Sequence, residues 1–356
     1  MPAPSYDVTD AADTKVSEPE SKKPDNTAFK QQRLPAWQPI LTAKSVLPTF
    51  FIIAILFIPL GAVFLVTSNS VIEVSEEYTN CFSLENPSMT CSKFRNNSTF
   101  APEQCTCQMS INVTSDMQGT VYVYYGLTNF FQNHRRYVKS RDDMQLVGET
   151  TTVSTVSSDC SPFDKVTVLR NGVNVTLPIA PCGAIANSLF NDTYTLTKPD
   201  SSSLNISRTG IAWDTDHTLK FNNPCDNLTE CFEETAKPVY WQRSVIQLDP
   251  DTPDNNGYKN EAFEVWMRTA AFPTFRKPYG RIVGGLPAGI YNLTINYTYP
   301  VAEFHGTKRF ILATTSWMGG KNNFLGIAYI TVGTCSFVVA IALCFLHYCS
   351  NQNKVH

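Results

Sequence analysis

Two long apolar runs stand out in the hydropathy pattern of this chain, and neither contains Asp, Glu, Lys or Arg. The first extends from Val46 to Val66 and the second from Phe324 to Leu346. A membrane-spanning helix needs about 20 apolar residues, and uninterrupted runs of this length are rare in soluble cores. Both runs are therefore predicted to be transmembrane helices. The first follows a mostly polar segment, which favours an uncleaved signal anchor over a signal peptide.

The two spans divide the chain into five predicted segments. They are an N-terminal tail (1–45), a first span (46–66), an ectodomain (67–323), a second span (324–346) and a C-terminal tail (347–356). Residues 1–23 are predicted to be disordered, because they are polar and lack apolar periodicity. The ectodomain is long enough for one sizeable core. Average composition conceals this organisation, since 43% hydrophobic residues and a mean hydropathy of −0.15 would suit a soluble protein.

The charges beside the first span predict which side of the membrane each segment occupies. Basic residues precede this span and acidic residues follow it: Lys30, Arg33 and Lys44, then Glu73, Glu76 and Glu77. The positive-inside rule then places the N-terminus in the cytosol, and with two spans the C-terminus as well. The second span has the opposite bias, with Lys308, Arg309 and Lys321 on its ectodomain side. We follow the first span, because it usually determines orientation.

Glycosylation signals agree with this orientation. All nine Asn-x-Ser/Thr sequons lie between the spans, and N-glycosylation takes place on the lumenal side of the membrane. The predicted glycosylation sites are Asn112, Asn174, Asn191, Asn205, Asn292 and Asn296, with Asn96, Asn97 and Asn227 as further candidates. The ectodomain is therefore predicted to be lumenal or extracellular.

Cysteine usage predicts the same compartment. Eight of the eleven cysteines lie between the spans: Cys81, Cys91, Cys105, Cys107, Cys160, Cys182, Cys225 and Cys231. An even set in an oxidising compartment is typical of disulfides. Short loops favour the pairs Cys225–Cys231 and Cys160–Cys182, and the first four would pair among themselves. Zinc binding at the close-set Cys105 and Cys107 is the alternative, but the chain has no CxxC pair, so no metal is predicted.

Alternation of apolar and polar residues predicts strands at residues 108–114, 120–125, 173–177 and 291–299. In three of these segments the apolar residues face one way and a sequon asparagine faces the other, as in a strand with one buried and one solvated face. Val173, for example, is predicted to face the core. An antiparallel β core is therefore expected.

Two short helices are predicted to interrupt the β core. One would be capped by Thr128 and reach Val138, and the other would be capped by Asn260 and reach Ala270. The first carries the basic cluster His134-Arg135-Arg136. Its lumenal position excludes nucleic acid as a partner and leaves a solvated face, an acidic partner surface or lipid headgroups.

No catalytic pattern emerges from the sequence. The five histidines show no HExxH spacing, and GxSxG, phosphate-loop and GxGxxG motifs are absent. The protein is therefore predicted not to be an enzyme and to bind no cofactor. The acidic segment from Asp249 to Gly257 fails as an EF-hand at Thr252 and Phe263. It is predicted to be an Asn-Gly turn with locally bonded side chains, while a different Ca²⁺ site stays open.

The second span carries a stripe of small residues at Gly326, Gly333, Ser336 and Ala340. Small residues on one face allow another helix to approach closely. The stripe is predicted to pack against a partner helix, and a lipid-facing helix is the alternative.

Several long segments resemble one known family. The matching segments are residues 24–43, 124–146, 179–192, 210–216, 254–277 and 316–330, and they include Gly210-IAWDTD-216 and Ser316-WMGGKNNFLGIAYI-330. The chain resembles the cell-division-cycle protein 50 (transmembrane protein 30) family, the β-subunits of type IV P-type ATPase lipid flippases, and is most similar to its animal A-type members. The resemblance implies a two-span membrane protein with a large β-rich, disulfide-bonded, glycosylated ectodomain that carries short helices.

The resemblance also implies a role and site residues. The chain would form a heterodimer with a flippase α-subunit and allow it to leave the endoplasmic reticulum. It would also support transport of phosphatidylserine or phosphatidylethanolamine to the cytosolic leaflet. Implied locations are the endoplasmic reticulum, Golgi and secretory vesicles, endosomes and the plasma membrane. Family disulfides map onto Cys81–Cys107, Cys91–Cys105 and Cys160–Cys182, with Cys225–Cys231 additional. Asn112 and Asn191 match family glycosylation positions. A further family sequon would fall near residue 294, and here Asn292 and Asn296 lie on either side of that position.

Two other classes of protein are compatible with the topology. A two-span ligand-gated channel subunit also has internal termini and a disulfide-rich ectodomain, but its pore needs polar lining residues. Here the spans offer only Thr331, Thr334 and Ser336 besides residues at their ends. A lumenal enzyme or receptor is the third class. Current from the purified protein would indicate a channel, and turnover without a partner would indicate an enzyme.

Overall fold

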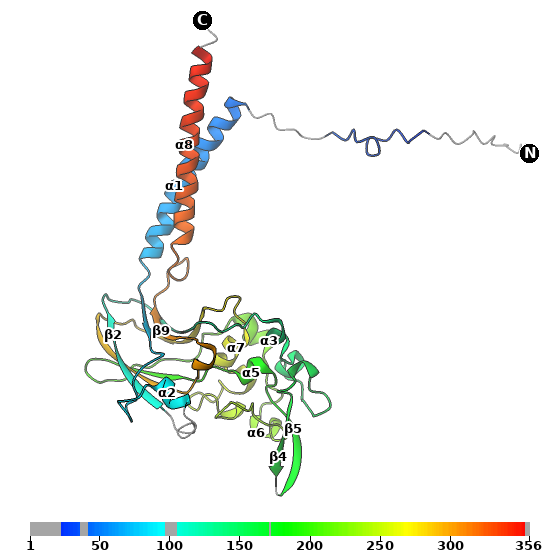
Figure 1. The fold of residues 1–356 in the computed structure, drawn as a ribbon, viewed down its shortest axis with the longest axis vertical. Helices are drawn as coiled ribbons and strands as arrows, with labels where there is room; N and C mark the ends of the chain where they lie inside the picture. Colours follow the sequence, from blue (N-terminus) through cyan, green and yellow to red (C-terminus); the bar gives the residue numbers. More distant parts are fainter. Residues whose placement is uncertain (1–22, 36–41, 97–104, 171, 353–356) are drawn as a thin grey trace, which may run out of the picture. The chain divides into compact units, whose positions relative to one another are not determined.

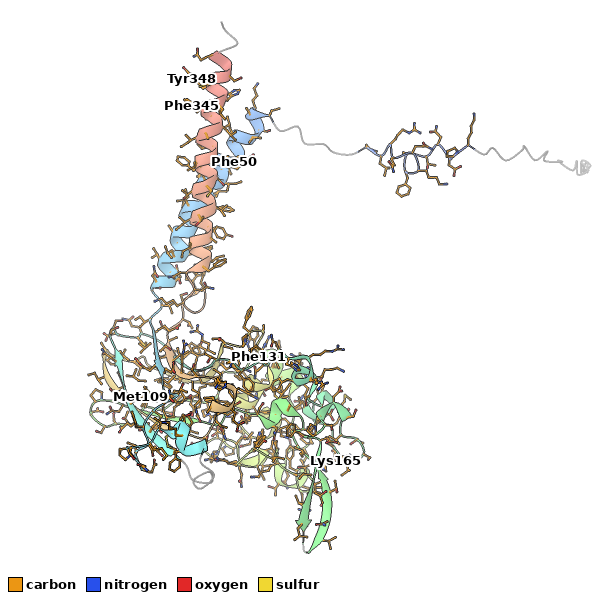
Figure 2. The ribbon with its side chains drawn as sticks, in the orientation of Figure 1. Phe50, Met109, Phe131, Lys165, Phe345 and Tyr348 are labelled. Atoms are coloured by element: carbon orange, nitrogen blue, oxygen red, sulfur yellow. A yellow bond between two sulfur atoms is a disulfide. The ribbon has the colours of Figure 1, made fainter. Side chains whose placement is uncertain are left out.

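The computed structural model describes residues 23–35, 42–96, 105–170 and 172–352. Predictions made for residues 1–22 and for Asn97 lie outside this part. Two long helices, α1 (Ala43–Asn69) and α8 (Phe324–Gln352), enclose the two predicted spans (Figure 1). Both are long and apolar enough to cross a membrane. Apolar side chains such as Phe345 and Tyr348 are exposed on α8 (Figure 2), as expected of a surface that faces lipid or a partner.

The described residues fall into two units, one within 1–53 and 336–356 and one within 54–335. In the first unit, the rings of Phe51 and Phe337 meet edge to face with their centroids 6.2 Å apart. In the second unit, the parts of α1 and α8 nearest the strands touch through glycine. A Cβ atom added to Gly61 would lie 2.8 Å from the backbone nitrogen of Ile330, and one added to Gly326 would lie 2.8 Å from that of Leu65. The glycines therefore permit backbone-to-backbone packing.

The described residues between the two long helices form two larger antiparallel sheets and one hairpin. The first sheet has the order β1 (Glu73–Glu77), β9 (Lys308–Ala313), β3 (Val121–Leu127), β7 (Phe275–Ile282). The second has the order β2 (Cys105–Val113), β8 (Gly289–Tyr297), β6 (Thr193–Thr197). The hairpin pairs β4 (Lys165–Arg170) with β5 (Val173–Pro178). The predicted antiparallel β core is confirmed.

One hydrophobic core draws side chains from both larger sheets. It includes Ile111 of β2, Val123 of β3, Leu293 of β8 and Leu312 of β9. β2 alternates as predicted, with Ile111 and Val113 inward and Asn112 between them outward. The prediction for residue 173 is wrong, because Val173 is 63% exposed. β4 and β5 extend away from the rest of the ectodomain (Figure 1), so the first residues of β5 have no layer to cover them.

Short helices fill the connections between strands. The α-helices are α2 (Cys91–Asn96), α3 (Arg135–Lys139), α4 (Asp143–Leu146), α5 (Ala184–Asn187), α6 (Leu228–Cys231) and α7 (Glu261–Met267). Five single turns are η1 (Ser158–Cys160), η2 (Asp216–Lys220), η3 (Val245–Gln247), η4 (Gly257–Lys259) and η5 (Ala302–Phe304). Asn260 caps α7 as predicted, since its side chain accepts a hydrogen bond from the backbone of Phe263.

Two helix boundaries differ from the predictions. Thr128 caps no helix, because its hydroxyl pairs with that of Thr307 at 2.9 Å and α3 begins only at Arg135. α7 ends at Met267 rather than Ala270. The buried ammonium of Lys277 donates to the backbone carbonyls of Val265, Trp266 and Arg268, and these bonds satisfy the open end of the helix.

Candidate protein-interaction surface

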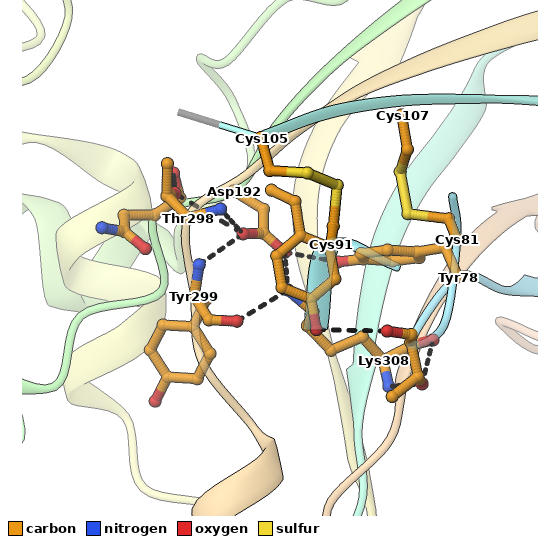
Figure 3. Close-up of polar contacts among 12 residues, drawn as sticks. Tyr78, Cys81, Cys91, Cys105, Cys107, Asp192, Thr298, Tyr299 and Lys308 are labelled. Atoms are coloured by element: carbon orange, nitrogen blue, oxygen red, sulfur yellow. Dashed lines mark hydrogen bonds and ion pairs between the residues drawn. A yellow bond between two sulfur atoms is a disulfide. The ribbon is translucent and has the colours of Figure 1, made fainter. Parts of the chain in front are cut away.

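The ectodomain contains four disulfides. They are Cys81–Cys107, Cys91–Cys105, Cys160–Cys182 and Cys225–Cys231, the pairs that the resemblance and the short loops suggested. The first two lie side by side and fasten the segment around α2 to β2 (Figure 3). Among the described residues, the one cluster with metal-ligand spacing is Cys81, Cys91 and Cys107. All three sulfurs are in disulfides, so this cluster offers no thiolate to a metal.

The sequons are unevenly distributed over the ectodomain. Asn112, Asn174, Asn205, Asn227 and Asn292 are exposed, whereas Asn191 and Asn296 are half-buried. Asn96 ends α2. None of the nine sequon asparagines falls within β1, β3, β7 or β9. The four-stranded sheet is therefore free of sugar attachment points, whereas β2, β5 and β8 each carry at least one.

The outer side of this four-stranded sheet forms a surface that we call the bare sheet face. It surrounds a hollow of about 360 Å³ whose lining includes Glu73 and Ser75 of β1, Gly126 of β3, Arg276 of β7 and Arg309 of β9. Gly126 has no side chain to fill this hollow. A Cβ atom added there would make only ordinary contacts, 3.5 Å from the side chains of Arg309 and Ile311. The bare sheet face therefore combines a hollow with charged groups of both signs.

Arg276 is the most connected residue of the bare sheet face. Its guanidinium lies 2.7 Å from the carboxylate of Glu73 and 5.0 Å from the ring centroid of Tyr124. A Cβ on Gly320 would lie 2.9 Å from the same guanidinium, so the loop that leads into α8 packs against it. Arg276 thus joins β7, β1, β3 and the α8 loop. Arg309 is exposed and makes no ion pair with any residue that the structure describes.

The bare sheet face lies at the roots of the two membrane helices. β1 begins at Glu73, shortly after α1 ends at Asn69, and β9 leads through a turn at Ser316–Gly319 into α8. Trp317 in this turn is 74% exposed, and its ring centroid lies 6.4 Å from that of Phe64 on α1. Tryptophan at the end of a span is typical of the membrane interface. The bare sheet face is therefore close in the chain to both spans.

A buried ion pair supports the bare sheet face from behind (Figure 3). Lys308 of β9 and Asp192, next to β6, approach to 2.6 Å with both side chains fully buried. The Asp192 carboxylate also accepts hydrogen bonds from the Tyr78 hydroxyl and from the backbone of Thr298 and Tyr299. Burial and the nearby Asp192 charge raise the pKa of Tyr78 well above its usual value. This network links the four-stranded sheet to the three-stranded sheet, whose strands β2 and β8 contain sequons.

The acidic turn has the local bonding that the sequence suggested. The Asp249 carboxylate accepts hydrogen bonds from the backbone of Asp251 and Thr252 and from the side chain of Asn255. The side chain of Asn256 bonds the backbone of Asp249 in both directions. The carboxylate at the centre of the turn is thus fully engaged by the turn itself. A Ca²⁺ site of another kind at this turn stays untested.

The other predicted site residues lie on two helices. His134, Arg135 and Arg136 are exposed at the start of α3. Gly326 and Gly333 face α1 of this same chain, since a Cβ on Gly333 would lie 2.8 Å from a side-chain carbon of Ile58. Ser336 and Ala340 are buried. Whether this stripe also receives a partner's helix stays a prediction.

Sequence reasoning missed the residues of the bare sheet face. β1 is too polar to show apolar alternation, and β7 contains Pro278, which lies where its register shifts against β3. A usable signal was the spacing of the sequons. None lies between Asn112 and Asn174, or between Asn227 and Asn292, and these stretches contain β3 and β7.

Comparisons with known proteins give a consistent result. Residues 64–353 match the model of the LEM3 (ligand-effect modulator 3) family / CDC50 family. The chain is 50% identical to Cell cycle control protein 50A of Mus musculus, over 92% of this chain and 90% of that protein. It is 46% identical to Cell cycle control protein 50B of Homo sapiens, over 88% and 90%. ALA-interacting subunit 3 of Arabidopsis thaliana is 40% identical over 95% and 90%.

Proposed function

Because this chain belongs to the CDC50 family, the accessory subunits of type IV P-type ATPases, we propose that it is the non-catalytic β-subunit of a phospholipid flippase. In this role it binds one ATPase α-subunit, allows that subunit to leave the endoplasmic reticulum and supports its transport cycle. The lipids moved to the cytosolic leaflet are phosphatidylserine and phosphatidylethanolamine. Both termini lie in the cytosol, and the complex reaches the Golgi, endosomes and plasma membrane.

The observation that carries this proposal is the sugar-free sheet at the roots of the membrane helices. An N-linked glycan is bulky and keeps other proteins away from the surface that bears it. The bare sheet face carries no sequon, contains a hollow of about 360 Å³ and presents the exposed Arg309. Charged groups around a hollow favour a partner with complementary charges. We assign this surface to the exoplasmic loops of the α-subunit.

The spans argue against the channel alternative. Thr331, Thr334 and Ser336 are the small polar residues inside the second span. The two threonines each donate the hydroxyl to a carbonyl of the same helix, on Ile327 and Ile330, at 2.8 Å, and Ser336 is buried. Their donors are therefore not directed at an ion pathway. The β-subunit proposal needs only apolar spans that pack beside another membrane protein.

A glycan placed on the bare sheet face tests the assignment. The single substitution Gly126→Asn creates the sequon Asn-Leu-Thr in the wall of the hollow, where an added Cβ makes only ordinary contacts. We expect the glycosylated variant to fold but to lose co-purification with the ATPase in mild detergent. Gly126→Gln has similar polarity without a sequon and should retain the partner.

The matched glycan control lies on the other sheet. Thr195→Asn creates a sequon with Thr197 at an exposed position of β6, and we expect this variant to retain the partner. Normal ATPase recovery with a glycan at position 126 would place the partner on another surface. If mass spectrometry of the wild-type pull-down contains no P-type ATPase, the β-subunit proposal itself fails.

A further inference from the structure

Two sequons lie directly opposite each other in the folded ectodomain. Thr193 of β6 pairs with Asn296 of β8. Two residues further along, the Thr298 hydroxyl donates to the backbone carbonyl of Asn191 at 2.6 Å. The asparagine of each sequon therefore faces the threonine of the other. Both asparagines also line the same hollow, so they lie on the same side of this sheet.

Two adjoining hollows meet at Asn191. One has a volume of about 150 Å³ and the other about 280 Å³. Both are lined by Leu189, Asn191, Gln242 and Thr298. Each is far larger than the roughly 30 Å³ that a water molecule takes in the liquid. Asn191 therefore stands in the wall shared by a double hollow that reaches the protein surface.

The chemistry of the double hollow suits a carbohydrate. Arg208 and Arg243 line its smaller part, and neither makes an ion pair with a described residue. Their N–H groups, with the amide of Gln242, are available to sugar hydroxyls and to an acetamide carbonyl. Tyr240 lines the larger part with its side chain 72% exposed, and its ring offers an apolar face. Most of the residues that line the smaller part are polar. A sugar presents hydroxyl groups as well as an apolar ring face, so it can match walls that are both polar and apolar.

Asn191, in the wall of the double hollow, also has a buried atom without a hydrogen-bond partner among the described residues. The side-chain oxygen of Asn191 is buried and accepts no hydrogen bond within the described part of the chain. Leaving a buried acceptor without a donor costs free energy. A polar group seated in the double hollow would be positioned to supply that donor.

From these observations we propose that the double hollow seats the first sugars of an N-linked glycan on Asn191, and that this glycan excludes one on Asn296. The inner N-acetylglucosamine residues lie against Gln242, Arg243 and Tyr240. Diagonal neighbours on one face of a sheet are about 7–8 Å apart, which leaves no room for two branched sugar chains. The inference rests on the lumenal topology of the proposed function.

Enzymatic release of glycans from the native protein tests the seat. The full-length chain, purified with its glycans in mild detergent, is treated with peptide-N-glycosidase F, and release at each site is followed by mass spectrometry. We expect release at Asn191 to be several-fold slower than at the exposed Asn112 and Asn174, and equal to them after denaturation. The Gln242→Ala/Arg243→Ala variant should accelerate release at Asn191 without changing it at Asn112. Equal native rates at all three sites would overturn the proposed seat.

Site occupancy tests the exclusion. In protein that has left the endoplasmic reticulum, we expect Asn191 to be glycosylated and Asn296 to be bare. Thr193→Ala removes the Asn191 sequon at an exposed position, and glycosylation of Asn296 should then rise. Substantial occupancy of both sites in exported wild-type protein would refute the exclusion. Absence of sugar from Asn112, Asn174 and Asn205 as well would instead contradict the lumenal topology, so the two failures are distinguishable.

Discussion

The ammonium nitrogen of Lys308 lies 2.6 Å from a carboxylate oxygen of Asp192, and neither side chain has any exposed surface. The pair joins β9, which leads towards α8, to the start of β6 in the three-stranded sheet. The ammonium also donates to the backbone carbonyl of Tyr299 and lies 3.0 Å from the ring centroid of Tyr297. A buried charge with this many partners orders the elements around it, because each partner would be left unsatisfied without it.

Removal of one partner of this ion pair should destabilise the ectodomain. Lys308→Met keeps much of the side-chain volume but leaves the Asp192 carboxylate buried without its counter-ion, a change that costs about 3–5 kcal/mol. We expect a clear fall in melting temperature and retention in the endoplasmic reticulum. Arg309→Met is the matched control, because this neighbour is exposed and its loss should leave the melting temperature unchanged. The added change Asp192→Asn should restore part of the lost stability, and no recovery would mean that the charge is not the cause.

The nested disulfides should matter more than the short one. Cys91→Ser opens a bond that spans 14 residues and lies in the buried core, and loss of such a disulfide costs roughly 2–5 kcal/mol. We expect poor assembly with the α-subunit and poor export. Cys225→Ser opens a bond across only 6 residues in an exposed loop, so less loop entropy is regained and export should persist. Equal export of both variants would contradict this ranking.

The contact between the spans should depend on glycine. Gly61→Leu places carbon atoms where the backbone nitrogen of Ile330 and the carbonyl of Gly326 now lie, within 3 Å of an added Cβ. The two helices must separate, and we expect lower thermal stability of the detergent-solubilised protein. The adjacent Ala62 is exposed, so Ala62→Leu adds similar bulk to the surface of α1 and should have little effect. Identical melting temperatures for the two variants would mean that this packing is dispensable.

The sequence predicted the parts of the fold that depend on local patterns. Spans follow from apolar length, and the buried alternation of β2 and β8 could be read directly from their residues. β9 could not be predicted in this way, because its buried Lys308 is acceptable only with Asp192, which is distant in sequence. Val173 shows the opposite case. It belongs to a strand with regular alternation, but its side chain is exposed because no other described part of the ectodomain packs on the hairpin there.

The candidate surface was harder to predict than the fold. Glu73, Arg276 and Tyr124 come from three strands, and only the sheet order brings them together. The small-residue stripe was visible in the sequence, but the sequence did not show that α1 of the same chain packs against Gly326 and Gly333. The pairing of the Asn191 and Asn296 sequons likewise depends on the register of β6 and β8.

Glu264 should make the stability of the ectodomain depend on pH. Its side chain on α7 is 1% exposed, one oxygen lies 2.9 Å from a ring nitrogen of His217, and the other has no hydrogen-bond partner among the described residues. Burial raises the pKa of Glu264 to about 7, and the charges of Glu261 and Asp216 add to the rise, against the lowering effect of His217. The folded protein therefore holds a proton on this group that the unfolded chain releases near pH 4.5.

The sign of the effect follows from this difference. The stability that protonated Glu264 contributes is fully present below about pH 4.5 and is lost as the pH rises to about 7. Each pH unit between these values lowers the free energy of unfolding by about 1.36 kcal/mol, so the total loss is at most roughly 3 kcal/mol. Glu264→Gln stays neutral, so its free energy of unfolding should exceed that of the wild type increasingly from pH 5 to pH 7. Melting curves of both proteins over this range measure the difference, in which the other titrating groups cancel. Glu149→Gln, at an exposed position, should show no such trend, and a pH-independent difference for Glu264→Gln would show that this carboxyl is ionised throughout.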